Sequence, residues 1–159
     1  MIDESILREQ LVYLLNGGGA HISFSEAIHG ISHEEAGRII SGMPHTIWDL
    51  IEHLRIAQWD ILEFIRNQEH TSPKFPEGYW PREHAPDSKK AFRTSIESFQ
   101  NDLNEITDIV KNTSLPLSSR IPHGEGQTVI REIFLVTDHN AYHLGQIIDI
   151  KKLVKREEF

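Results

Sequence analysis

The sequence contains no cysteine among its 159 residues. This absence excludes disulfide bonds, thiolate metal sites and a cysteine nucleophile. Any thiol chemistry in this protein would therefore involve a thiol carried by a small molecule. The chain also lacks an apolar run near the ~18 residues that cross a bilayer. Its N-terminus, MIDESILREQ, is acidic and polar, which does not fit a secretory signal, and we expect a cytoplasmic protein.

Basic residues are also scarce, with 16 Lys and Arg against 24 Asp and Glu and a net charge of −8. Proteins that bind nucleic acid need a Lys/Arg surface to neutralise phosphates, so this balance argues against a nucleic-acid partner. A basic cluster does occur near the C-terminus, at Lys151, Lys152, Lys155 and Arg156. At the end of a helix such charges complement the helix dipole, which is the simpler interpretation of the cluster.

Four long segments place hydrophobic residues at helical spacing, and no segment has the alternation typical of a strand. The expected helices span about residues 3–16, 46–67, 87–112 and 128–154. Thr46 and Asp49 have the spacing of a capping box, which marks the start of the second helix. A shorter helical piece is expected from Phe24 to Ile28, after the glycine run at 17–19.

Two long loops, at residues 68–86 and 114–127, separate the last three of these helices. The first is rich in proline and carries Phe75, Tyr79 and Trp80. Because loops of this length usually serve a function, we expect the three aromatic residues to wall a binding pocket. The chain length fits a single domain, 1–159. The pattern predicts an all-α fold, a four-helix bundle with long loops after the second and third helices.

The chain has ten histidines, and His139 and His143 are four residues apart on the last predicted helix. Four residues turn a helix by about 400° and advance it by about 6 Å, so the two rings share one face. Two imidazoles placed in this way can bind one metal ion. The alternative is a pair of core histidines that hydrogen bonds satisfy.

A second pair, His29 and His33, has the same spacing, so spacing alone does not identify a site. That pair spans Gly30, near an expected helix end, and is followed by two glutamates that favour solvent. The pair at His139 and His143 instead borders an apolar face, where buried imidazoles need partners. We therefore predict the metal site on the last helix.

A metal site needs at least a third protein ligand. His53 is the best candidate because it lies in the middle of the second helix, between Leu50 and Leu54 and on the inner edge. His123, in the loop before the last helix, can add a fourth ligand or carry protons. Gln146 lies one turn past His143 on the same face, where it can orient a ligand. Three imidazoles with open positions describe a catalytic site, and all-nitrogen ligation suits Zn or Ni, and also Fe.

A di-metal carboxylate bundle is the main rival among helical metal proteins. It needs a Glu-x-x-His motif on each of two helices. In this sequence only Glu26 and His29 have that spacing, so the rival interpretation fails.

With these histidines on these helices, the chain resembles the DinB-like superfamily of metal-binding four-helix bundles. The resemblance rests on PHTIWDLIEHLRIAQWDI at 44–61 and LVTDHNAYHLGQIIDIKKL at 135–153. It implies that His53 joins His139 and His143 as ligands of a divalent metal, often zinc or nickel. It also implies a homodimer. Characterised relatives activate low-molecular-weight thiols for transfer or isomerisation, as bacillithiol S-transferases do.

Two functions are compatible with these features. The first is a metal-dependent enzyme that activates a small thiol or water, in the thiol S-transferase or hydrolase class. The second is a non-catalytic metal-binding or stress-related bundle, because no side chain beyond the predicted ligands is an unambiguous acid, base or nucleophile. In either case the expected partner is a small molecule, with neither nucleic acid nor a membrane involved.

Overall fold

The structure is a computed structural model that describes residues 3–17 and 19–156. The helices are α1 (Glu4–Leu15), α2 (Phe24–Ile28), α3 (His33–Ala36), α4 (Ile47–Arg66), η1 (Glu77–Tyr79), α5 (Lys89–Lys111) and α6 (Val129–Arg156). The described residues form no strand beyond an isolated bridge between Arg120 and Thr128. None of the helices among them has the length and apolar character needed to cross a membrane.

The four long helices match the predicted ones to within two residues at each end, which confirms the all-α bundle. The start of α4 shows why the boundaries were predictable. Thr46 Oγ1 accepts from the Asp49 amide at 3.1 Å, and Asp49 Oδ2 accepts from the Thr46 amide at 2.9 Å. This capping box satisfies amides that have no partner inside the helix.

The sequence reasoning missed two short helices, α3 and the 3-10 helix η1 inside the expected loop at 68–86. The segment around Gly30 and Ser32 was interpreted as a helix end, and α2 does end there. Ser32 also starts a new helix, because its side chain and that of Glu35 form a second capping box. The Ser-x-x-Glu spacing was the available signal.

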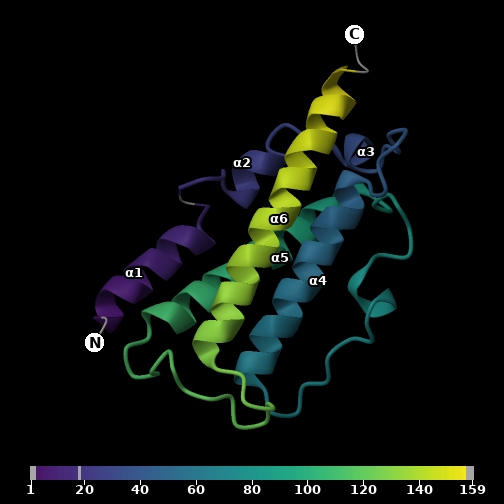
Figure 1. Ribbon diagram of the computed structural model, residues 1–159. Coiled ribbons are helices and arrows are strands. Elements are labelled where there is room, and N and C mark those ends of the chain that lie inside the picture. The colour runs from purple at the N-terminus through teal and green to yellow at the C-terminus, as the bar shows by residue number, and fades with distance from the viewer. Residues whose placement is uncertain (1–2, 18, 157–159) are drawn as a thin grey trace.

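In Figure 1, α4 and α6 lie side by side, with α5 behind them and α1 against the lower half of the bundle. A buried polar layer sets the register of these helices. Gln58 of α4 donates to the Phe99 carbonyl of α5 at 2.7 Å and accepts from Asn140 of α6 at 3.0 Å. Asn140 follows His139 directly, so this layer fixes the height of α6 beside α4 at the point where the histidines lie.

The core fills the space between the helices on both sides of this layer. One apolar cluster joins α4 to the upper part of α6 and another joins α1, α4 and α5 to the lower part. Fully buried members include Leu50, Leu54, Phe99, Ile147, Leu62, Ile106 and Ile133. Burial on both sides holds the facing surfaces of α4 and α6 rigidly, because packed interiors resist deformation.

Arg8 of α1 is a buried charged residue, with 7% of its surface exposed. Its guanidinium donates to the Val110 carbonyl, to the Asn112 carbonyl at 3.0 Å and to the Leu115 carbonyl at 2.6 Å. It also pairs with Glu4 at 2.6 Å. The last carbonyls of a helix lack partners within it, so Arg8 satisfies the C-terminal end of α5.

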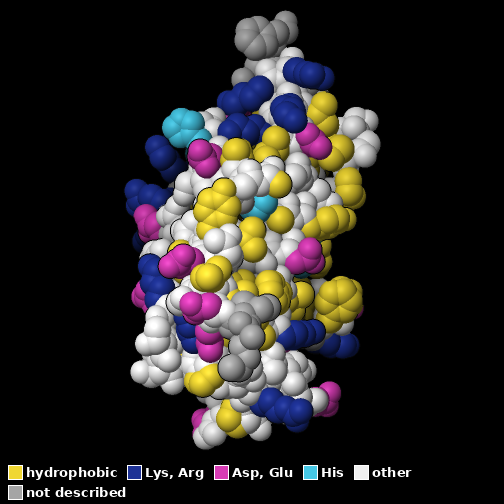
Figure 2. Space-filling view, turned by 60° about the vertical axis from the view of Figure 1, so that its left-hand side comes forward, with side chains coloured by type: hydrophobic (Ala, Val, Ile, Leu, Met, Phe, Trp, Pro, Cys, Tyr) yellow, Lys and Arg dark blue, Asp and Glu magenta, His cyan; other side chains and the backbone are white. Residues whose placement is uncertain are grey.

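The basic cluster near the C-terminus lies at one end of the molecule, where Figure 2 shows Lys and Arg side chains together. Lys151 donates to the Ala27 carbonyl at 2.9 Å and the His29 carbonyl at 2.7 Å, at the end of α2. Lys155 pairs with Glu35 of α3. These contacts fasten the two short helices to α6.

The loop between α4 and α5 runs back along α4 for most of its length (Figure 1). Within it, a Cβ on Gly78 would lie 2.7 Å from the Cβ of Pro73, so the loop packs closely on itself.

The glycine run after α1 also has a structural reason. Gly17 has a φ of 77° and a Cβ there would meet Ser23, although Gly18 lies outside the described residues.

Candidate metal centre

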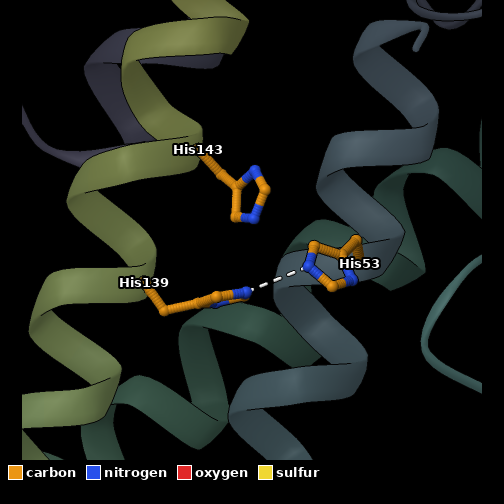
Figure 3. Close-up of side chains that lie close together, drawn as sticks. All are labelled: His53, His139 and His143. Atoms are coloured by element: carbon orange, nitrogen blue, oxygen red, sulfur yellow. Dashed lines mark hydrogen bonds between the residues drawn. The ribbon is translucent and has the colours of Figure 1, made fainter. Parts of the chain in front are cut away.

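The structure brings His53 of α4 together with His139 and His143 of α6, and one ring nitrogen of each lies within 4.8 Å of the others. Figure 3 shows the three rings converging on the space between the two helices. His139 and His143 share a face because they are one turn apart, as predicted. His53 faces them because α4 and α6 pack side by side. Among the described residues, this is the group whose geometry could hold a metal ion.

The protonation of His53 follows from its partners. Its Nδ1 lies 2.8 Å from the Tyr79 carbonyl oxygen, and a carbonyl only accepts, so the ring proton is on Nδ1. Its Nε2 therefore carries a free lone pair when the ring is neutral. This lone pair faces His139, whose Nε2 is 3.0 Å away (Figure 3).

His143 is oriented in the same way by a side chain of its own helix. Its Nδ1 donates to the Gln146 amide oxygen at 2.7 Å, which leaves the Nε2 lone pair free. The sequence predicted that Gln146 can orient a ligand, and the structure places its amide oxygen against His143 Nδ1. Hydrogen bonds to the second ring nitrogen are the usual partners of metal-binding histidines.

Hydrogen bonding alone does not account for the whole cluster. A proton on His139 Nε2 can bridge to His53, which satisfies these two nitrogens as a core pair. This hydrogen bond provides no partner for the Nε2 of His143, which Figure 3 shows directed toward the same space. A cation between the three rings satisfies all three nitrogens at once, so the residues present fit a metal ion.

The electrostatic setting keeps the rings neutral and available as ligands. Burial, followed by the neighbouring His143 and His53, lowers the pKa of His139 to about 4. Burial also lowers the pKa of His53 and of His143 below the ordinary histidine value. All three rings are therefore neutral at neutral pH, the form in which imidazole binds metals.

Aromatic rings from the loop and from α6 border the cluster. The Trp80 indole stacks on His53, with ring centroids 4.0 Å apart and planes within 1°. His45 stacks with Trp80 as well, at 4.3 Å, and Tyr142 lies edge-on to His143 at 4.8 Å. Trp80 thus stands where the sequence predicted a wall. Phe75 does not, because it is 76% exposed.

His123 is not among the three converging histidines. Its Nε2 donates to the Phe64 carbonyl at 2.7 Å, and its ring packs edge-on against Phe64. Phe64 is eleven residues beyond His53 on α4, which is about 16 Å along the helix axis. The structure therefore separates His123 from the cluster, for which it was a candidate fourth ligand or proton carrier.

His29 and His33, the pair with the same spacing, also lie apart from the cluster. His29 is the residue that ends α2, and His33 begins α3, so the two do not share a helix. His33 lies 2.9 Å from the Glu34 carboxylate. The helical geometry that brings His139 and His143 together is absent from this pair.

No partner for His70 or His84 could be predicted from the sequence, and the structure places both on carboxylates of α4. His70 Nε2 lies 2.7 Å from Asp60 Oδ1, and His84 Nδ1 lies 2.9 Å from Asp49 Oδ2. The two pairs fasten opposite ends of the loop to α4. No sequence signal marks them, because ten and 35 residues separate the partners.

Comparison with known proteins gives one match. The profile described as the DinB superfamily matches residues 22–147, a range that includes all three converging histidines. No curated protein and no solved structure matches the chain. The family match covers most of the sequence and agrees with the helical bundle and with the resemblance carried by the histidine segments. The chain therefore belongs to the DinB superfamily.

Proposed function

We propose that the protein is a divalent-metal-dependent enzyme that activates a small thiol or water at the site formed by His53, His139 and His143. One observation supports this proposal most strongly. The three Nε2 atoms converge, while hydrogen bonds to Tyr79 and Gln146 hold the Nδ1 protons of His53 and His143 on the far side of their rings. Preorganised lone pairs of this kind are what a first-row divalent ion binds.

The donor set determines the chemistry that such a site favours. Three neutral imidazoles add no negative charge, and the converging group contains no carboxylate. A bound divalent ion supplies Lewis acidity there and lowers the pKa of a thiol or water that it binds. All-nitrogen ligation suits zinc or nickel, and also iron. The absence of cysteine in the chain agrees with a thiol that arrives as a substrate.

The surrounding residues have separate roles in this proposal. His53 and the α6 pair hold the ion, and Gln146 orients His143. Trp80 covers one face of His53 and keeps water from that side of the site. Excluding water strengthens the electrostatic interactions inside a site, because the local dielectric constant falls.

Binding of a small thiol to the zinc-loaded protein tests the proposal. At a 2-mercaptoethanol concentration one hundred times its Kd, binding adds about 2.7 kcal/mol of stability. For a chain of this size that raises the melting temperature by roughly 5–10 °C. Ethylene glycol, which has a hydroxyl in place of the thiol, and metal-free protein serve as controls. A cobalt-loaded sample should also gain a sulfur-to-cobalt absorption band.

A non-catalytic metal-binding bundle is the second candidate. The observation that favours it is that the ring stacked on His53 and the ring edge-on to His143 belong to Trp80 and Tyr142, aromatic side chains rather than carboxylates. Metal uptake without any thiol-dependent shift or absorption band, and without metal-dependent consumption of thiol by an alkylating electrophile, would favour this candidate over the enzyme.

A further inference from the structure

We propose that Asp60 is a positioning residue for the metal centre and acts on His53 through Tyr79. This inference rests on the metal site proposed above and goes beyond it, because Asp60 is not one of the converging ligands. Asp60 follows His53 by seven residues on α4. Seven residues are almost two full turns, so Asp60 lies on the same face of α4, about 10 Å along the axis.

Asp60 is a buried carboxylate that fastens the loop to α4. It is 8% exposed, and both of its oxygens accept hydrogen bonds from loop residues. Oδ2 accepts from the Tyr79 hydroxyl at 2.6 Å, and Oδ1 accepts from His70 Nε2 at 2.7 Å. A buried charge is stable only where hydrogen bonds replace its water, so the carboxylate and these loop residues hold one another in place.

Tyr79 connects this anchor to the metal centre, because its hydroxyl and its backbone carbonyl contact different turns of α4. Its hydroxyl donates to Asp60, while its backbone carbonyl accepts from His53 Nδ1 at 2.8 Å. Burial and then the Asp60 carboxylate raise the pKa of Tyr79 to about 12, so the hydroxyl remains a donor at neutral pH. The position of the carbonyl that fixes His53 therefore depends on the anchor at Asp60.

The next residue along the loop adds a second restraint on the same ring. Trp80 stacks on the face of His53 at 4.0 Å with parallel planes. The carbonyl of Tyr79 sets the direction of the Nδ1–H bond, and the Trp80 indole sets the plane of the imidazole. Freeing the Tyr79 side chain from Asp60 would loosen both restraints, since the two residues are neighbours in the chain.

The other end of the loop offers a matched control. His84 pairs with Asp49 at 2.9 Å, and its carbonyl accepts from Thr46 Oγ1 at 2.8 Å. The His84 side chain is 66% exposed, and it pairs with Asp49 rather than with any of the three converging histidines. A His84→Ala variant therefore removes a loop anchor without touching the connection through Tyr79.

Zinc affinity of the Tyr79→Phe variant, measured by competition with a chromogenic chelator, tests the proposal. The change removes one hydroxyl oxygen and keeps the ring. We expect zinc binding to weaken by about tenfold, the lower end of what loss of an orienting partner causes. Asp60→Ala should weaken binding at least as much, and adding Tyr79→Phe to it should have no further effect, because both act through one bond. His84→Ala should bind zinc like the wild type.

A measurement without metal separates this proposal from the proposed function. Nitrogen NMR of the metal-free wild type should show His53 with its proton on Nδ1, and Tyr79→Phe should show both tautomers. Wild-type protein that takes up no zinc overturns the proposed function. In that case the change of the His53 tautomer between the wild type and Tyr79→Phe tests whether Asp60 positions the ring. Unchanged zinc affinity in Tyr79→Phe, or an unchanged His53 tautomer where zinc does not bind, overturns the role of Asp60.

Discussion

Replacing His139 and His143 together by alanine should abolish metal binding. The two rings provide two of the three converging nitrogens, and His53 alone cannot hold a divalent ion against water. We expect less than about a tenth of an equivalent of zinc after loading and dialysis, against about one equivalent in the wild type. Far-UV circular dichroism should show unchanged helix content, because α6 keeps its apolar packing.

The matched control is His29→Ala with His33→Ala, which removes two histidines of the same sequence spacing. Both lie outside the converging group, one at the end of α2 and one at the start of α3. This variant should load zinc like the wild type. If the variant without His139 and His143 still holds as much zinc as this control, the metal binds elsewhere in the chain.

Arg8→Ala should be among the most destabilising single substitutions in the protein. It removes the donor to the Val110 and Asn112 carbonyls at the end of α5 and to the Leu115 carbonyl in the loop that follows. Leaving buried acceptors unsatisfied costs about 1–3 kcal/mol each, so we expect a loss of about 3–5 kcal/mol. The melting temperature should fall by roughly 10 °C for a chain of this length.

Urea unfolding is the appropriate measurement for Arg8→Ala, because the midpoint reports the change directly when the slope is unchanged. Arg93→Ala provides the control. Arg93 is on the surface of α5, with 68% of its side chain exposed, and faces Glu97 at 3.6 Å. An exposed pair of this kind contributes little. A loss in Arg8→Ala no larger than that in Arg93→Ala would contradict the role assigned to Arg8.

The long helices and one pair of converging histidines were predictable because their signals are local. Thr46 and Asp49 mark the start of α4 through a capping box, and apolar spacing carries each long helix. His139 and His143 meet because residues four apart share a face of any helix. His53 was different. Its place opposite the pair depends on how α4 packs against α6, and the family resemblance supplied what periodicity could not.

The rest of the site depends on the path of the loop, which no local pattern fixes. Trp80 was expected near the pocket, but its stacking on His53 depends on the hydrogen bond between Tyr79 and Asp60.

The burial of Arg8 was unpredicted for a related reason. Arginine in an amphipathic helix is usually solvated, and only the position of the α5 end gives it buried partners.

The central claim is that His53, His139 and His143 bind one divalent metal ion. The most direct test is the metal content of wild-type protein purified without a histidine tag, then reloaded with zinc or nickel and dialysed. The predicted result is about one equivalent per chain, lost with a strong chelator and regained on reloading. Less than about half an equivalent of any transition metal after reloading would contradict the claim.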